Sequence, residues 1–528
     1  MNQIIEEVAY TWFNRFAALR FMEVNNYLPS RVRVFTNPAG EFKPEILSEA
    51  IHLDLDGLDM EKVYALKETN NDEALFKYLI ITQCNALSSV LPGMFQKIED
   101  YTELLFPDNL LRKGSVVEQI VTIIPEDDWK DQVQIIGWLY QYYNKELKDQ
   151  VFADIKRNKK ITKGKIPAAT QLFTPDWIVR YMVENSLGRL WLDGHPNEKL
   201  QKNWKYYIEE AKQEPDVQVK LDEIKKEHAK LEPTDIKCID PCMGSGHILC
   251  YMFDVLMQIY EIYGYDSRHA AASIVENNLY GLDIDERASQ LAYFAVMMKA
   301  CQYDRRFLRR GIQPRVYAIE ESNAISSYVV DYFVNNDPKI RKMVDTLISE
   351  FHDAKEYGSI LNISMLNFDE LNQRASECKE EIEINLYQGK VEEQIVPLIH
   401  VGQILAQKYH VVVTNPPYAG SKGLNDKLRK KIKDLYSCAT GDLFTPFIVK
   451  ALYLINSIGE AGIITPTSWL YNPRYSKYRE YLINHLQIIN LTELGDSAFE
   501  VGFGTSVFIF NATLQKIIGV LILMRKIW

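Results

Sequence analysis

The feature that most constrains the fold is the stretch VVVTNPPY at residues 411–418. Three consecutive valines predict a buried β-strand, because β-branched residues favour the pleated conformation. The two prolines that follow end the strand, since neither can donate to a sheet ladder. The sequence therefore predicts a strand that leads directly into a rigid loop.

The residues of that loop suit a planar amino group. The side-chain oxygen of Asn415 and the carbonyl of Pro416 are acceptors that can together hold two N–H bonds. Pro416 has a fixed φ, which keeps its carbonyl aimed, and Tyr418 offers a flat face on which a flipped-out base can stack. We expect Asn415, Pro416, Pro417 and Tyr418 to be catalytic, with a plain strand-ending turn as the alternative.

Composition bounds the class of protein. The 528 residues predict about three domains, and 47% hydrophobic and 25% charged residues indicate an ordinary globular chain. The chain begins without a signal-peptide pattern and has no apolar run of transmembrane length, so we expect no membrane partner. The odd number of scattered cysteines favours reduced thiols in a cytoplasm.

We expect no metal. Cys238, Cys242 and Cys250 lie close together, yet no second Cys/His pair follows at ligand spacing. We interpret these three cysteines as core or loop thiols.

Charge argues against a uniformly basic surface, because the net charge is −11. Binding to DNA would then depend on local patches, and three basic clusters occur at 156–165, 305–310 and 427–433. Each is equally compatible with a solvated helix face. We expect the cluster at 427–433, which follows the Asn-Pro-Pro-Tyr loop, to face DNA more than the one at 305–310.

The chain before residue 236 predicts mainly helices. An aromatic amphipathic pattern over 10–22 opens a helical N-terminal domain, 1–155. Residues 156–235 then carry a Phe-Thr-Pro motif and a charged connector. We expect Thr174 to be the N-cap and Pro175 the first residue of a helix that continues to Leu192.

A second motif is DPCMGSGH at residues 240–247, between a predicted strand at 236–239 and an apolar helix at 248–260. Glycines in such a loop let the backbone approach a ligand closely. The loop is not a P-loop, since no Gly-Lys-Ser/Thr follows. An acid at the strand end, Asp240, suits a cationic ligand such as the ammonium of S-adenosylmethionine better than it suits pyrophosphate.

Two further strands are predicted, at 278–282 and 315–319. The first ends at Asp283, whose carboxylate can take both hydroxyls of a ribose. The second ends near Asn323. Residues 324–400 read as a charged helical insertion, and later strands are predicted at 462–466, 488–494 and 504–510.

The order of these motifs resembles that of the DNA adenine-N6 methyltransferases that place target recognition after the catalytic domain. Open α/β sheets bind ligands at the carboxyl ends of their strands, so all the motifs can converge on one crevice. The resemblance implies a Rossmann-like α/β methyltransferase domain at 236–515 with a mixed, mostly parallel sheet and S-adenosylmethionine as cofactor. The cofactor-binding residues that it implies are Phe173, Thr174, Asp240, Pro241, Gly244, Gly246, Asp283 and Asn323, the last departing from the usual Asp.

The aromatic N-terminal helix and the insertion resemble the PglX-type methyltransferases of bacteriophage-exclusion (BREX) systems. This resemblance implies methylation of double-stranded host DNA with a flipped adenine, and contact with other defence-system proteins. Family members continue into a target-recognition region, whereas 516–528 carries no such pattern, so we expect a truncated tail.

Two other functions remain open. Methyltransferases that act on RNA guanine or on protein glutamine share the Asn-Pro-Pro-Tyr motif. A truncated subunit that binds DNA or partners without turnover is the second alternative.

Overall fold

The computed structural model describes residues 2–96, 105–157, 159–170, 172–211, 213–381, 386–421, 423–495, 499, 504–512 and 521–523. The chain divides into two compact units. One comprises Met1–Tyr140 with Gln290–Gln313, and the other comprises Gln141–Ser289 with Pro314–Trp528. The domain boundaries predicted at residues 155 and 235 were placed from sequence motifs, whereas the two units are separated by their internal contacts. The predicted boundaries stay a prediction.

The regular secondary structure in the described part of the first unit is helical, with turns and loops between the helices. Its opening helix contains the predicted aromatic pattern, and Trp12, Phe16 and Phe21 are buried. Phe16 packs edge-on against Phe35, with ring centroids 6.0 Å apart. The helices that lie wholly or partly in this unit are α1 (Asn2–Val24), α2 (Glu45–Ser48), α3 (Met60–Glu68), α4 (Asp72–Leu87), α6 (Val116–Ile123), α7 (Glu126–Trp129), α8 (Gln134–Tyr143) and α17 (Glu286–Tyr303).

The second unit is built on a mixed sheet with eight strands in the described residues, in the order β3-β2-β1-β4-β5-β7-β6-β8. All the strand pairs are parallel except those that β7 makes with β5 and β6. The strands are β1 (Cys238–Asp240), β2 (Leu279–Asp283), β3 (Arg315–Ala318), β4 (Tyr409–Thr414), β5 (Ile455–Pro466), β6 (Leu486–Gly495), β7 (Thr505–Ala512) and β8 (Leu521–Leu523).

This sheet confirms the predicted fold class. Each of the seven strands predicted from hydrophobic runs is present, because such runs mark strands that are buried on both faces. The strand β8 was not predicted. It is the one described segment of the expected tail at 516–528, whose other residues lie outside the described part of the chain.

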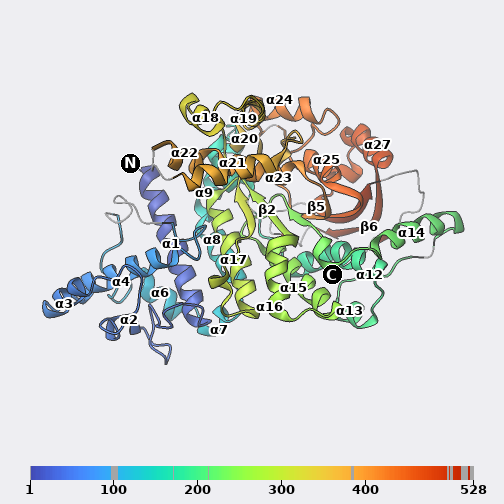
Figure 1. Cartoon of the computed structure of the whole chain (residues 1–528). Helices are drawn as coiled ribbons and strands as arrows, with labels where there is room; N and C mark the ends of the chain where they lie inside the picture. Colours follow the sequence, from blue (N-terminus) through green and yellow to red (C-terminus); the bar gives the residue numbers. More distant parts are fainter. Residues whose placement is uncertain are drawn as a thin grey trace. The chain divides into compact units, whose positions relative to one another are not determined.

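The two faces of the sheet are covered by different helices. Ala461 and Ile463 of β5 point into an apolar core shared with the helices that follow β3 and β4. Gly462 points the other way, where an added Cβ would lie 3.2 Å from the backbone oxygen of Met182 in α11 (Asp176–Val183). Helices α18 to α23 and helices α12, α15 and α16 accordingly lie on opposite sides of the sheet (Figure 1).

The remaining helices follow the order of the chain. Before β1 come α9 (Lys145–Lys156), α10 (Ile166–Thr170), α11, α12 (Arg189–Gly194), α13 (Glu198–Asn203) and α14 (Pro215–His228), and between β1 and β2 come α15 (His247–Tyr263) and α16 (Ser267–Ser273). Between β3 and β4 lie α18 (Ser327–Val334), α19 (Pro338–Glu350), α20 (Ala354–Tyr357), α21 (Phe368–Glu380), α22 (Leu386–Gln394) and α23 (Val396–Ala406). After β4 come α24 (Asp426–Leu435), α25 (Phe444–Leu454), α26 (Ser468–Tyr471) and α27 (Ser476–His485).

None of the helices in the described residues combines the length and the apolar character that a membrane crossing requires.

Candidate functional site

Three of the predicted motifs lie at the carboxyl ends of neighbouring strands. The strand β1 pairs in parallel with both β2 and β4, in a register that places Ile239 beside Tyr280 and Val412. The loops that leave these three strands therefore emerge at the same edge of the sheet. Such an edge is where open α/β sheets bind ligands.

Asp240 ends β1 and is fully buried. Its Oδ1 accepts hydrogen bonds from the backbone N–H of Cys242 at 3.0 Å and from the hydroxyl of Thr414 at 2.7 Å. Its Oδ2 has no hydrogen-bond partner among the described residues. A buried carboxylate oxygen without a partner is costly, so this position favours a ligand that brings a donor or a positive charge.

The glycine loop after β1 is held against the end of β2. The backbone N–H of Gly244 donates to Asp283 Oδ2 at 2.9 Å, and that of Met243 donates to the carbonyl of Leu282 at 3.0 Å. Gly244 and Gly246 have φ angles of +52° and +85°, a region that side chains rarely adopt. Apart from its two chain neighbours, no heavy atom of the described residues lies within 4 Å of a Cβ built on Gly244, so this backbone borders space that a ligand can occupy.

Asp283 is half-buried at the end of β2, and its Oδ1 accepts from the backbone N–H of Asp285 at 2.9 Å. Burial raises the pKa of Asp283 to about 6. Burial, together with the charge of Asp283, raises the pKa of Asp240 to about 7. Two buried acids with raised pKa values fit a ligand that carries both hydroxyls and an ammonium, as S-adenosylmethionine does, because such groups favour the ionised carboxylates.

The Phe-Thr-Pro segment contacts the Asn-Pro-Pro-Tyr loop and the residue that follows the glycine loop. Its local structure differs from the prediction. The helix α11 begins at Asp176, so the expected N-cap role of Thr174 and the expected helical position of Pro175 are wrong. The ψ angle of Pro175 is 141°, which is extended. The buried hydroxyl of Thr174 instead accepts from Asn415 Nδ2 at 3.0 Å, so it binds the Asn-Pro-Pro-Tyr loop and not an N–H group of the helix.

His247 fixes this segment to the glycine loop and was not predicted as a site residue. Its Nδ1 lies 3.1 Å from the carbonyl oxygen of Thr174, and its ring stacks on Phe173 with centroids 4.7 Å apart. Its Nε2 lies 3.5 Å from Asp176, and this contact is the main cause that lowers the pKa of Asp176 to about 2. A histidine directly after the glycine loop was the only sequence signal.

The Asn-Pro-Pro-Tyr loop, which is predicted to be catalytic, begins directly after β4. The side-chain oxygen of Asn415 accepts from the hydroxyl of Tyr418 at 2.6 Å, and that hydroxyl also lies 3.0 Å from the carbonyl of Ile464. No hydrogen bond to the Pro416 carbonyl occurs among the described residues, which leaves this acceptor available. The half-buried Tyr418 ring meets Phe444 edge-on, at a centroid distance of 6.4 Å. The stacking role of Tyr418 and the catalytic role of Pro417 stay predictions.

Asn323 is engaged elsewhere. Its Nδ2 donates to Asp353 Oδ1 at 2.9 Å, and its Oδ1 accepts from the backbone N–H of Asp353 at 2.8 Å. An amide with both ends bound to the insertion has less capacity to read an adenine ring. Its predicted cofactor role remains a prediction.

The insertion between β3 and β4 also supplies an unpredicted contact to the glycine loop. The hydroxyl of Ser359, which is buried, donates to the carbonyl of Pro241 at 2.6 Å. Gly358 precedes it with a φ of +63°, and an added Cβ there would lie 2.9 Å from Ile284. No sequence pattern marks this turn, because its role depends on packing against residues more than seventy positions away.

The basic cluster after the Asn-Pro-Pro-Tyr loop is partly neutralised. Lys427 forms an ion pair with Asp353 at 2.6 Å, and the Lys431 ammonium lies 5.0 Å from the centre of the Tyr357 ring. Lys430 and Lys433 are exposed on the same helix, α24, and have no ion pair among the described residues. Lys430 and Lys433 are therefore the residues of this cluster that are best placed to contact DNA phosphates, and the DNA-facing role of the cluster stays a prediction.

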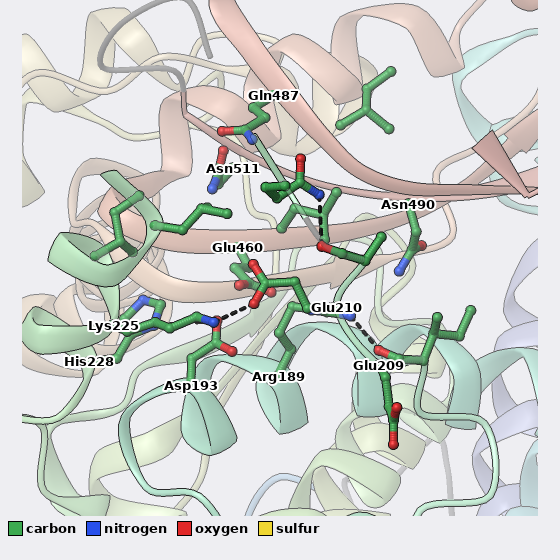
Figure 2. Close-up of a pocket in the computed structure, with 17 residues that line it drawn as sticks. Arg189, Asp193, Glu209, Glu210, Lys225, His228, Glu460, Gln487, Asn490 and Asn511 are labelled. Carbon is green, nitrogen blue, oxygen red and sulfur yellow. Dashed lines mark hydrogen bonds and ion pairs between the residues drawn. The ribbon is translucent and has the colours of Figure 1, made fainter. Parts of the chain in front are cut away.

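A separate polar cavity of about 60 Å³ lies beside β5, β6 and β7 and contains none of the predicted site residues. Its lining includes Arg189 and Asp193 from α12, His228 from α14, and Glu460 from β5 (Figure 2). Glu460 Oε2 and His228 Nδ1 have no hydrogen-bond partner among the described residues. A polar space of this size accommodates a few water molecules, which would supply the missing partners.

Comparison with known proteins identifies the relatives of this chain. The family described as Eco57I restriction-modification methylase matches residues 277–499. The adenine-specific methyltransferase BrxX of Escherichia coli O9:H4 (strain HS) is 37% identical over 94% of this chain and 43% of its own length. The adenine-specific methyltransferase PglX of Lacticaseibacillus casei (strain Zhang) is 39% identical over 95% of this chain and 42% of its own length.

Solved structures are more distant in sequence. A complex of DrdV with DNA covers 99% of this chain and 42% of its own chain, with a TM-score of 0.43 and 11% identity. The chain thus spans less than half the length of the curated relatives it matches. Over most of its own length, the chain is therefore similar in sequence to the adenine-specific methyltransferases BrxX and PglX.

Proposed function

We propose that this chain carries the catalytic part of an S-adenosylmethionine-dependent methyltransferase that modifies the N6 amino group of adenine in double-stranded DNA. The observation that carries the proposal is the convergence of Asp240, Asp283 and Asn415 at the ends of three adjacent strands. The carboxyl groups of Asp240 and Asp283 then form an acidic cradle for the cofactor. The side-chain oxygen of Asn415, an acceptor suited to an amino group, lies on the adjacent strand end.

The cradle residues have separate tasks. The backbone of Gly244 borders open space and would form the floor of the cradle. The Asp283 carboxylate accepts two backbone N–H groups, and its remaining lone pairs can accept hydrogen bonds from the ribose hydroxyls. The unpartnered Oδ2 of Asp240 can accept from an ammonium if the loop admits one. Bound in this cradle, S-adenosylmethionine would supply an electrophilic methyl group.

The catalytic loop orients the other reactant. Asn415 Oδ1 and the Pro416 carbonyl accept the two N–H bonds of the amino group, which directs the nitrogen lone pair out of the base plane. Positive charge develops on that nitrogen during transfer, and two fixed carbonyl dipoles stabilise it without reorganisation. Positioning then supplies most of the rate, with the base taken out of the duplex at a cost of a few kcal/mol.

The biological setting follows from the relatives. We infer a phage-exclusion system in the cytoplasm, with host DNA methylated to mark it and with other defence-system proteins as partners. The names BrxX and PglX and their adenine specificity support this setting.

The decisive experiment measures transfer of a tritiated methyl group. Unmodified double-stranded DNA, RNA and protein substrates should be compared, with and without the other proteins of the defence system, and Asn415→Ala should serve as the inactive control. Label on DNA adenine alone supports the proposal. Label on RNA or on protein glutamine would assign the chain to another substrate class. Donor binding without transfer under every condition would leave a binding subunit.

A further inference from the structure

The carboxamide of Asn415 is held by a segment that lies 241 residues earlier in the chain. Its Nδ2 donates to Thr174 Oγ1 at 3.0 Å and to the carbonyl oxygen of Leu172 at 3.3 Å. Because Nδ2 carries two hydrogens, these bonds use both. The oxygen accepts from Tyr418 at 2.6 Å, so three contacts fix the plane of the amide.

The direction of the amide follows from the Leu172 contact. A backbone carbonyl can only accept, so the nitrogen of Asn415 must face Leu172. Rotation of the amide by 180° would set two oxygens against each other there. The oxygen is therefore turned toward the Tyr418 side, with one of its two lone pairs still available.

The segment that imposes this direction is itself anchored. The carbonyl of Thr174 accepts from His247 Nδ1 at 3.1 Å, and His247 is the first residue of α15, directly after the glycine loop. Thr174 is 5% exposed, so water does not compete strongly for its hydroxyl. One residue thus joins the glycine loop, through its carbonyl, to the catalytic loop, through its hydroxyl.

We propose that Thr174 is a positioning residue that sets the side-chain amide of Asn415 with its oxygen toward the target, so that the site selects an amino group. An amide held this way accepts an N–H from the substrate and repels a carbonyl or an unprotonated ring nitrogen. The reversed amide would present N–H donors and would favour those acceptors instead. The inference rests on the proposed function and deepens it, because it assigns the choice of amino group to the Phe-Thr-Pro segment.

The test compares Thr174→Val, which keeps the shape and loses the hydroxyl, with Thr174→Ser, which keeps the hydroxyl. The first readout needs no activity: the side-chain amide resonance of Asn415 in the full chain labelled with ¹⁵N-asparagine, assigned with Asn415→Ala. We expect Thr174→Val to shift that resonance and speed its exchange with solvent, while Thr174→Ser leaves both near wild type. Thr445→Val is the matched control, because Thr445 is also a buried threonine, with a hydroxyl that donates to the carbonyl of Ala439 at 2.8 Å.

The second readout separates positioning from donor binding. We expect Thr174→Val to lower kcat about tenfold, the scale of one lost hydrogen bond, with donor affinity by calorimetry within about twofold and KM little changed. Thr174→Ser should restore kcat. If Thr174→Val does not fold, Thr174→Ala replaces it in both measurements.

The outcomes are distinguishable. An Asn415 resonance that is indifferent to Thr174→Val overturns the positioning role, whether or not the chain is active. Donor affinity that falls as much as kcat does would also overturn it, because Thr174 would then act at the donor. If wild type transfers no methyl group but the resonance responds, the proposed function fails and the positioning role stands.

Discussion

Two polar regions of the sheet-bearing unit are satisfied in different ways. At the strand ends, most of the side-chain polar atoms described above pair with protein atoms: both oxygens of Asp283 accept backbone N–H groups, and every polar atom of the Asn415 side chain has a partner. The exception there is Asp240 Oδ2, which has no hydrogen-bond partner among the described residues. In the cavity beside β5, the hydrogen-bond partners are missing among the described residues for Glu460 Oε2, His228 Nδ1, Arg189 Nε, Asn490 Nδ2 and Asn511 Oδ1.

The difference indicates how each region tolerates change. Direct hydrogen bonds fix side chains to within a few tenths of an ångström, which is what catalysis by positioning requires. Groups that depend on water can readjust when one of them is replaced. We therefore expect substitutions at the strand ends to change chemistry, and substitutions in the cavity to change stability alone.

The largest effect is expected at Asn415. Asn415→Ala removes an acceptor that matters most as charge develops, so methyl transfer should fall by about 10²-fold or more. Donor affinity, measured by calorimetry, should stay within about twofold. Asn197→Ala is the control, because Asn197 is a half-buried helix cap far from the strand ends in sequence, whose loss should cost about 1 kcal/mol of stability and no transfer. Near-normal turnover of Asn415→Ala would remove the catalytic role of this loop.

Asp283 should control the donor. Asp283→Ala removes a carboxylate acceptor, and its loss should weaken donor binding by about 10- to 100-fold. Asp266→Ala provides the comparison, since Asp266 accepts two backbone N–H groups at the start of α16 but follows no strand of the sheet. Equal affinity of Asp283→Ala and wild type would exclude the ribose role.

Donor binding should also depend on pH. Burial raises the pKa of Asp240 to about 7 and that of Asp283 to about 6, so the donor-free chain retains protons near pH 6. A cationic ligand favours the ionised carboxylates and should release those protons. Affinity should rise between pH 5.5 and 8, by up to about tenfold per pH unit for each proton released. Calorimetry in buffers of different ionisation enthalpy counts the protons, and a flat profile would contradict this electrostatic account.

On α24 the same contrast separates Lys427, which forms an ion pair, from Lys430 and Lys433, which form none among the described residues. Lys430→Ala with Lys433→Ala should reduce the slope of log affinity for DNA against log salt concentration by about 1.8, since each phosphate contact contributes about 0.9. Lys427→Ala should leave the slope nearly unchanged, because Lys427 is already paired with Asp353 at 2.6 Å. A salt titration that gives the same slope for all the variants would make this helix an ordinary solvated surface.

The smallest effect is expected in the cavity. Burial raises the pKa of Glu460 well above its usual value, so its ionisation opposes folding as pH rises. Glu460→Gln should therefore be more stable than wild type at pH 8, on the order of 1 kcal/mol, and the gain should shrink as pH falls toward 4. Thermal melting at several pH values measures this. A loss of methyl transfer in Glu460→Gln would break the distinction between the two regions.

The sequence predicted the elements of the site well and their connections less well. Runs such as 411–413 specify a strand, and parallel strands bring their carboxyl ends together, so the approach of Asp240, Asp283 and Asn415 was predictable. The bond between Thr174 and Asn415 was not, because it joins segments 241 residues apart and uses a hydroxyl that local rules assign to a helix cap. The contact between Ser359 and Pro241 could not be predicted either, since a glycine and a serine between helices indicate only a turn.

The strand order has a consequence for the synthesis of the chain. The strand β1 ends at Asp240, but β4, which completes one of its edges, begins only at Tyr409. At about 5–20 residues per second, a ribosome needs roughly 8 to 35 seconds to make the intervening residues. A β1–β2–β3 sheet that forms early would expose unpaired backbone groups along β1 throughout that interval. The nascent chain would then be most prone to aggregation before its Asn-Pro-Pro-Tyr loop is synthesised, and chaperone protection would matter most in that window.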